Sequence, residues 1–271
     1  MAAPFPLLKG TKIWHSEPYP GIEPSRPELS AKGKTVVVSG GGSGIGAAVV
    51  KAFAAAGAPQ IAIFGRRHNV LQTTKAEIER DYPSTKVSTV TADVTNATEV
   101  DAAFDEIARK LGKIDVFVSN SGFLSTPSAI ASSDFDDWWT SMETNVKGAF
   151  LVSRAFIRHA AKDAYLLNIS TGIGHMPALP GGMSAYATSK AAAIKLFEYV
   201  ALENPGIHVV SVQPGVVESD VNRKSGLPGM DHGKSRTRSI FVSPYNGTIV
   251  NGNIADKGFL QLTFLVTSAS G

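Results

Sequence analysis

Short apolar runs alternate with longer stretches of helical periodicity along most of the chain. The runs are rich in β-branched residues and show no apolar/polar alternation, which predicts strands that are buried on both faces. They occupy residues 35–40, 61–65, 87–93, 115–122, 165–170 and 207–215. Helical stretches separate the runs, and those at residues 47–57 and 98–112 end in glycine, a residue typical of helix C-termini.

This alternation predicts right-handed βαβ units and therefore an α/β fold, a doubly wound parallel sheet of the Rossmann type in a single domain. Residues 34–232 hold all of the expected strands. Residues 1–33 carry six prolines and little periodicity, which predicts an extended N-terminal arm. Residues 233–271 begin as a polar run, and we identify no final strand of the sheet among them.

The composition restricts the class of protein. A chain of 271 residues with 43% hydrophobic and 18% charged residues suits one large globular domain and excludes collagen-like, coiled-coil and wholly disordered proteins. The absence of cysteine excludes disulfides, thiolate zinc sites and cysteine nucleophiles. The histidines lack the spacing of metal ligands, so no metal is expected.

The charge and the hydropathy exclude two kinds of partner. The opening segment lacks the pattern of a signal peptide, and no apolar stretch reaches the roughly 18–20 residues of a membrane helix, so a cytoplasmic protein without membrane contact is expected. The formal net charge of +3 resides in residues 233–271, which leaves the preceding chain neutral. A nucleic-acid partner is therefore not expected.

The first expected strand ends in a glycine-rich turn, Ser39 to Gly46, that leads directly into a helical stretch. Glycine allows the sharp turn, and the N–H groups at the helix N-terminus favour a pyrophosphate there. Because the turn lies at the first crossover of a βαβ unit, dinucleotide binding is the preferred interpretation over a flexible loop.

Two arginines follow the second expected strand. A site selective for NAD would carry a carboxylate near this point to bind the ribose hydroxyls, whereas an arginine suits the 2′-phosphate of NADP. Arg66 and Arg67 therefore favour NADP(H) over NAD(H). A solvated basic loop is the alternative interpretation.

Tyr186 and Lys190 are four residues apart in an alanine-rich helical run, which places both side chains on one helix face. An ammonium beside a phenol stabilises the tyrosinate and lowers the phenol pKa, which suits a general acid/base near neutrality. Taken alone, the pair is better explained as an ordinary surface contact.

Several motifs occur together in one order along the chain. They are the glycine-rich turn, Asp93, Ser119-Asn120-Ser121-Gly122, Asn145, Ser170-Thr171, Tyr186 with Lys190, and Pro214-Gly215. This set resembles the short-chain dehydrogenase/reductase family over residues 34 to about 232, and the N-terminal arm resembles that of fungal members. The resemblance implies an NADP(H)-dependent enzyme that interconverts a ketone or an aldehyde and an alcohol, and it implies a homodimer or homotetramer if the native C-terminus is intact.

The resemblance also implies roles for individual residues. Tyr186 is the general acid/base, Lys190 binds the nicotinamide ribose and lowers the tyrosine pKa, and Asn145 positions a water of a proton relay. Either Ser170 or Thr171 orients the substrate, Thr171 having the position of the usual serine. The residues expected to bind the cofactor are Gly40, Gly42, Ser43, Gly44, Ile45, Gly46, Arg66, Arg67, Asp93, Val94, Asn120, Ser121, Gly122, Tyr186, Lys190, Pro214, Gly215, Val217 and Ser219.

Residues 233–271 depart from the family pattern. Residues 233–235 can be encoded by a sequence like a splice donor, and residues 262–271 resemble the fungal proteins when read in another frame. We therefore hypothesise a retained intron followed by a frameshifted exon, with a divergent genuine C-terminus as the alternative. A spurious tail would remove a sheet edge and part of the substrate lid, so the second functional hypothesis is a catalytically impaired isoform that still binds the cofactor.

Overall fold

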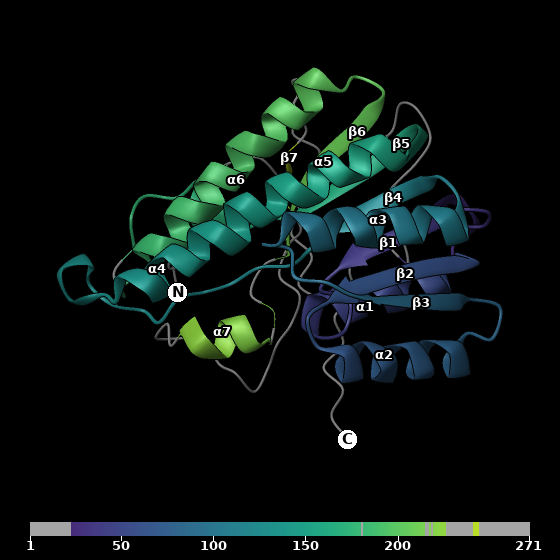
Figure 1. Ribbon diagram of the computed structural model, residues 1–271, viewed down its shortest axis with the longest axis horizontal. Coiled ribbons are helices and arrows are strands. Elements are labelled where there is room, and N and C mark those ends of the chain that lie inside the picture. Colours follow the sequence, from purple (N-terminus) through teal and green to yellow (C-terminus); the bar gives the residue numbers. More distant parts are fainter. Residues whose placement is uncertain (1–22, 180, 215–216, 218, 226–240, 244–271) are drawn as a thin grey trace, which may run out of the picture.

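The computed structural model describes residues 23–179, 181–214, 217, 219–225 and 241–243 (Figure 1). They form one seven-stranded sheet with the strand order β3-β2-β1-β4-β5-β6-β7. The strands are β1 Thr35–Ser39, β2 Gln60–Gly65, β3 Lys86–Thr91, β4 Ile114–Ser119, β5 Ala160–Ile169, β6 Ile207–Gln213 and β7 Phe241–Ser243. The first six are parallel, so the expected doubly wound α/β fold is confirmed.

The helices cover both faces of this sheet (Figure 1). They are α1 Gly44–Ala55, α2 His68–Asp81, α3 Ala97–Leu111, α4 Phe135–Met142, α5 Ala149–His159, α6 Ser184–Glu203 and α7 Asp220–Ser225. Short helical turns occur at η2 Pro27–Leu29, η3 Ile130–Ser132, η4 Glu143–Gly148 and η5 Gly172–Gly174.

Two apolar clusters hold the layers together, one on each side of the sheet. Alternation along β1 shows the division, because Val36 and Val38 face the cluster under α1 and α2, whereas Val37 faces the cluster under α3, α5 and α6. In the second cluster Phe104 meets Phe117 edge to face at 5.3 Å between ring centroids. Burial of these apolar side chains on both sides stabilises the sheet. Because its first six strands are parallel, their carboxyl ends lie at one edge.

Strand β5 begins at Ala160, earlier than the apolar run that starts at residue 165. The added residues pair irregularly with β4, since the register shifts between Ile114 and Val116. Asp163 has a positive φ of 57°, which is uncommon for a residue other than glycine. A bulged segment of this kind carries no periodic apolar signal.

Two expectations about the ends of the chain need correction. The edge of β6 is not left bare, because the three-residue strand β7 pairs antiparallel with residues 211–213. The end of the arm is not extended either: residues 27–29 form a 3-10 turn, and buried Ala31 donates its N–H to Ala56 O at 2.8 Å. Residues 1–22 and the rest of residues 233–271 lie outside the described part of the chain, so the hypotheses on them stay predictions.

None of the helices in the described ranges combines the length and the apolar character that crossing a bilayer requires. The location in the cell and the lack of a nucleic-acid partner stay predictions.

Candidate active site

The glycine-rich turn joins the end of β1 to the start of α1. Gly40 has a φ of 65°, a backbone conformation that glycine adopts without strain. A Cβ on Gly46 would lie 2.1 Å from Gly40 O, so only glycine lets the first turn of α1 pack this closely on the loop. Ser43 precedes α1 and makes no side-chain capping bond, which leaves the first N–H groups of the helix to an anion. The turn therefore fits the pyrophosphate of a dinucleotide.

Asn120 and Ser39 fix this turn to the end of β4. The Asn120 side-chain amide donates to Ser39 O at 3.0 Å and to Gly40 O at 3.3 Å. In return, buried Ser39 Oγ accepts from Asn120 N at 2.9 Å and from Ser121 N at 3.1 Å. Sequence reasoning missed Ser39; a hydroxyl at the end of a strand buried on both faces was the available signal.

The two arginines after β2 lie at the open side of the turn. Arg67 donates from its guanidinium to Ser43 Oγ at 3.0 Å. Arg66 Nη1 lies 4.0 Å from Asp93 Oδ2, and its side chain is 71% exposed. Asp93 also accepts from the N–H and hydroxyl of Thr95 at 2.9 Å, which orients its carboxylate after β3. Both side chains are exposed, and Arg67 contacts the glycine-rich turn directly through Ser43.

The remaining cofactor candidates lie on several elements, and only some of them contact the turn. Ser219 lies beside it, since a Cβ on Gly44 would be 3.8 Å from Ser219 Cβ. Gly42 packs instead against α2, where its Cβ would meet Val70 and Leu71 side chains at 3.2 Å. Further members Val94, Pro214 and Val217 are buried, Ile45 is partly buried, Gly122 is exposed, and Gly215 lies outside the described residues.

Asn145 sits in η4, a single π-helical turn between α4 and α5. Such turns leave the ordinary backbone hydrogen bonding of a helix and often occur at functional sites. Asn145 Oδ1 accepts from Phe123 N at 2.8 Å, and its Nδ2 donates to Phe123 O at 2.8 Å and to Ser189 Oγ at 2.9 Å. Both amide protons are therefore used, so a relay water would have to donate to an oxygen of Asn145.

Helix α6 carries the phenol and the ammonium on one face. Lys190 is 7% exposed, donates from Nζ to Ile169 O at 3.0 Å, and lies 5.8 Å from the ring centroid of Tyr186. Among the residues described by the structure Ile169 O is its one hydrogen-bond acceptor, which leaves two of its three ammonium protons for other acceptors. Ser189 donates to Tyr186 O at 3.0 Å, and with its bond from Asn145 it ties η4 to this helix. Ser189 was missed, although its spacing of three from Tyr186 places it on the same face.

The two titrating groups are perturbed by loss of hydration. Burial raises the pKa of Tyr186 to about 12 and lowers the pKa of Lys190 to about 8. The direction for Tyr186 is opposite to the lowering that the sequence led us to expect. Lys190 Nζ donates to Ile169 O and lies 5.8 Å from the Tyr186 ring centroid, so desolvation outweighs its attraction for a tyrosinate. The phenol is therefore protonated at neutral pH and is a proton donor.

The two candidate substrate-orienting hydroxyls follow β5 but differ in surroundings. Ser170 N donates to Val212 O at 2.8 Å, while Ser170 Oγ is buried and has no hydrogen-bond partner among the residues that the structure describes. Thr171 is partly exposed and comes just before η5. The exposed position suits contact with a substrate, whereas the orphaned hydroxyl of Ser170 lies inside the protein.

Together these residues lie beyond the carboxyl ends of β1, β4, β5 and β6, where ligands of doubly wound sheets bind. The arrangement offers a protonated phenol, a cation beside it and an anion site at a helix N-terminus. In the described part of the chain, no group of three or more His, Asp or Glu side chains is placed to hold a metal ion.

Comparisons with known proteins agree with this geometry. Residues 34–227 match the family model described as short chain dehydrogenase. The short chain dehydrogenase tazN of Aspergillus terreus is 34% identical over 215 residues, which cover 76% of this chain and 46% of that protein. The chain thus spans about half the length of that relative. The short chain dehydrogenase pigC of Monascus ruber is 32% identical over 242 residues, covering 86% of this chain and 76% of the relative.

Solved structures share the fold as well. A short-chain dehydrogenase/reductase from Serratia marcescens superposes with a TM-score of 0.65 and 28% identity, covering 71% of this chain and 78% of the other. A short chain dehydrogenase from Burkholderia cenocepacia in complex with NADP has a TM-score of 0.66 and 30% identity, covering 72% and 78%. The chain therefore belongs to the short-chain dehydrogenase/reductase family of NAD(P)-dependent oxidoreductases.

Proposed function

We propose that the protein is an NADP(H)-dependent oxidoreductase that interconverts a ketone or an aldehyde and the corresponding alcohol. The observation that carries the proposal is the placement of Tyr186 and Lys190 on one face of α6, with Lys190 bonded to the end of β5. This places an acid at the same edge of the sheet as the anion site of the glycine-rich turn. The carbonyl carbon is the hydride acceptor, and its oxygen needs a proton from the protein.

In this proposal each side chain has a separate task. The Tyr186 hydroxyl donates its proton to the carbonyl oxygen during reduction and takes it back during alcohol oxidation. Lys190 keeps positive charge beside the tyrosine, and its two available N–H groups bind ribose hydroxyls. Thr171 offers a hydroxyl that orients the carbonyl oxygen. NADPH supplies the hydride when it is bound.

Turnover with a panel of ketones and aldehydes tests the function. Purified protein and NADPH should lose NADPH absorbance when a suitable carbonyl compound is added. A rise in unfolding temperature with NADPH, but no turnover across the panel, would favour instead the catalytically impaired isoform. If NADPH neither stabilises the protein nor is consumed with any carbonyl compound, both proposals are contradicted.

The preference for NADP(H) is proposed from Arg66 and Arg67 beside the turn. The NADP complex of the Burkholderia cenocepacia structure supports it. Replacing Arg66→Asp should lower the preference for NADPH over NADH by about tenfold or more, because a carboxylate repels the 2′-phosphate and accepts from ribose hydroxyls. Dissociation constants for both cofactors measure the effect. Arg80→Asp, an equally exposed arginine at the far end of α2, should leave the ratio unchanged. An unaltered ratio in Arg66→Asp would overturn the assignment.

We also propose that the protein forms a homodimer or a homotetramer. Helices α4, α5 and α6 expose large apolar side chains that a monomer would leave in water. These side chains are Phe135, Trp139, Phe150, Tyr199 and Leu202, with exposures from 47% to 69%. Association that covers these side chains would remove them from water, and none of the three helices forms the glycine-rich turn.

A further inference from the structure

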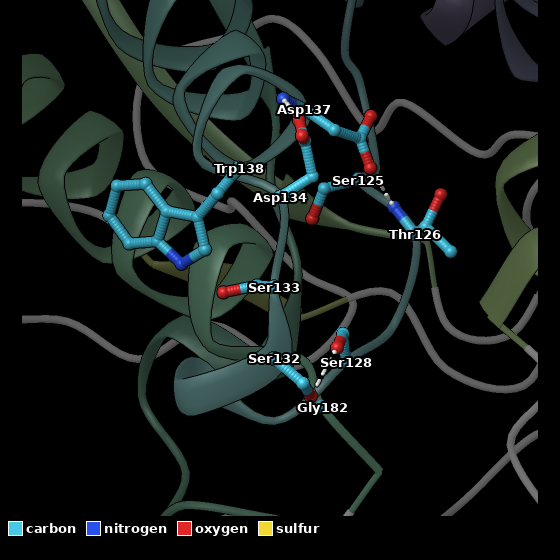
Figure 2. Close-up of a pocket in the computed structure, with 9 residues that line it drawn as sticks. All are labelled: Ser125, Thr126, Ser128, Ser132, Ser133, Asp134, Asp137, Trp138 and Gly182. Atoms are coloured by element: carbon cyan, nitrogen blue, oxygen red, sulfur yellow. Dashed lines mark hydrogen bonds between the residues drawn. The ribbon is translucent and has the colours of Figure 1, made fainter.

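A cavity of about 320 Å³ lies between the loop that follows β4 and the segment that precedes α6 (Figure 2). Its walls are formed by serine and threonine hydroxyls, two carboxylates, one indole ring and a glycine. A pocket for an apolar ligand would be lined by hydrophobic side chains with only a few polar groups. This lining therefore indicates a hydroxylated or charged ligand.

One hydrogen bond attaches the cavity to the helix that carries the proposed acid, and another attaches it to the segment before that helix. Trp138 donates from Nε1 to Ser184 Oγ at 3.1 Å, and Ser128 N donates to Gly182 O at 3.1 Å. Ser184 is the first residue of α6, two positions ahead of Tyr186. The walls of the cavity are thus held next to the start of the catalytic helix.

Ser125 supplies a binding group that the protein itself does not use. Its side chain is 5% exposed, and Figure 2 shows its hydroxyl directed into the cavity. The Ser125 N–H is bonded to Ser141 Oγ, but within the described residues the Ser125 hydroxyl has no partner. The Ser125 hydroxyl is not one of the fully buried hydroxyls without a partner, which in the described residues are those of Ser153 and Ser170, so it is open to the cavity and can bond a ligand.

The two carboxylates of the cavity are largely compensated by the protein. Asp134 accepts from Asp137 N at 2.8 Å at the start of α4, and Asp137 accepts from Thr126 N at 2.6 Å. The latter bond holds the pKa of Asp137 below its usual range, so the carboxylate is ionised. Both sit at a helix N-terminus, whose positive end offsets their charge. The carboxylates thus remain acceptors for hydroxyl groups and offer a cation little net attraction, whereas the carboxylate of an anionic ligand has no proton to donate to them.

We propose that this cavity binds a neutral polyhydroxylated group, such as a polyol chain or a sugar. Ser125 and the wall hydroxyls exchange hydrogen bonds with the ligand, and Asp134 and Asp137 accept from it. The apolar face of Trp138 covers its carbon atoms. The inference rests on the proposed function in one respect: the polyhydroxylated group is taken to be part of the substrate, whose carbonyl group lies toward Tyr186.

Four matched six-carbon probes test the site without cofactor. They are sorbitol, 1,6-hexanediol, gluconate and 1-amino-1-deoxysorbitol. Their binding to the full chain is measured by ligand-observed NMR titration. Sorbitol should bind, hexanediol and gluconate should bind at least tenfold more weakly, and the aminosorbitol should stay within about threefold of sorbitol. Equal binding of hexanediol, tighter binding of gluconate, or tenfold tighter binding of the amine would overturn the proposal.

Variants tie the binding to this cavity. Ser125→Ala should raise the dissociation constant for sorbitol about fivefold to tenfold, because one hydrogen bond is lost. Ser153→Ala is the matched control, since Ser153 on α5 is 2% exposed and its hydroxyl likewise has no partner in the described part of the chain. That control should stay within twofold of the wild type. Ser132→Trp, at an exposed part of the lining, should block the cavity without changing a buried residue. Unchanged sorbitol binding in both cavity variants would overturn the proposal.

The outcomes separate this inference from the proposed function. Sorbitol binding that Ser125→Ala weakens, in a protein that reduces no carbonyl compound, supports the cavity and contradicts the oxidoreductase proposal. Carbonyl reduction without sorbitol binding contradicts the cavity alone.

Discussion

Replacing Tyr186→Phe is expected to lower kcat for carbonyl reduction by roughly 100- to 10,000-fold, the range that general acid/base groups contribute. The change removes one oxygen atom from a half-buried ring and leaves Lys190 bonded to Ile169 O. Because the pKa of Tyr186 is raised to about 12, the wild-type phenol carries its proton at neutral pH and can release it to the product alkoxide. Phenylalanine has no such proton.

The control for this variant lies on the same helix. Tyr199→Phe makes the same chemical change at a residue that is 54% exposed, so kcat should stay within about twofold of the wild type. NADPH should raise the unfolding temperature of all three proteins equally, which would show that the cofactor site is intact. A Tyr186→Phe variant with wild-type kcat would refute the role given to this phenol.

The parts of the fold that periodicity encodes were predicted from the sequence. The expected strands at residues 61–65 and 207–215 agree closely with β2 and β6; the apolar side chains of β2 are buried as expected, whereas those of β6 other than Val212 are only partly buried. The first half of β5 was not foreseen, since its pairing with β4 shifts register and places exposed Lys162 and Asp163 in a strand. Apolar periodicity carries no information on such a bulge.

The site divides in the same way. The glycine-rich turn was predicted because its constraint is local: residue 46 must be glycine, since a Cβ there would lie 2.1 Å from Gly40 O. The contacts of Asn145 were not predicted, since they depend on a π-helical turn and on Ser189 from another helix. The cavity was also missed, because Ser125 reads as one polar residue of a loop until Gly182 is placed opposite it. Long-range contacts of this kind need the tertiary structure.

The second large effect is expected from Lys190→Met, which should abolish most activity while making the protein more stable. Loss of the cation beside Tyr186 and of its ribose contacts should lower kcat/KM by about 100-fold or more. Burial lowers the pKa of Lys190 from 10.5 to about 8, so keeping it charged at pH 7 destabilises the folded state. Removing that charge should raise the free energy of unfolding by about 2 kcal/mol at pH 7. This value is the gain from no longer burying the charge minus the loss of the hydrogen bond to Ile169 O.

The pH dependence of stability isolates this lysine. Between pH 8 and 10 the folded protein releases the Lys190 proton while the unfolded chain keeps it, so the unfolded state binds more protons and stability rises with pH. The raised pKa of Tyr186 acts in the opposite sense only above pH 10. Denaturant unfolding at pH 7 and pH 9.5 should therefore show a smaller advantage of Lys190→Met at the higher pH. Lys195→Met, whose side chain is 65% exposed on the same helix, should show no such change. If Lys190→Met is less stable than the wild type at pH 7, the buried ammonium does not destabilise the fold. The proposal that Lys190 serves activity while lowering stability is then wrong.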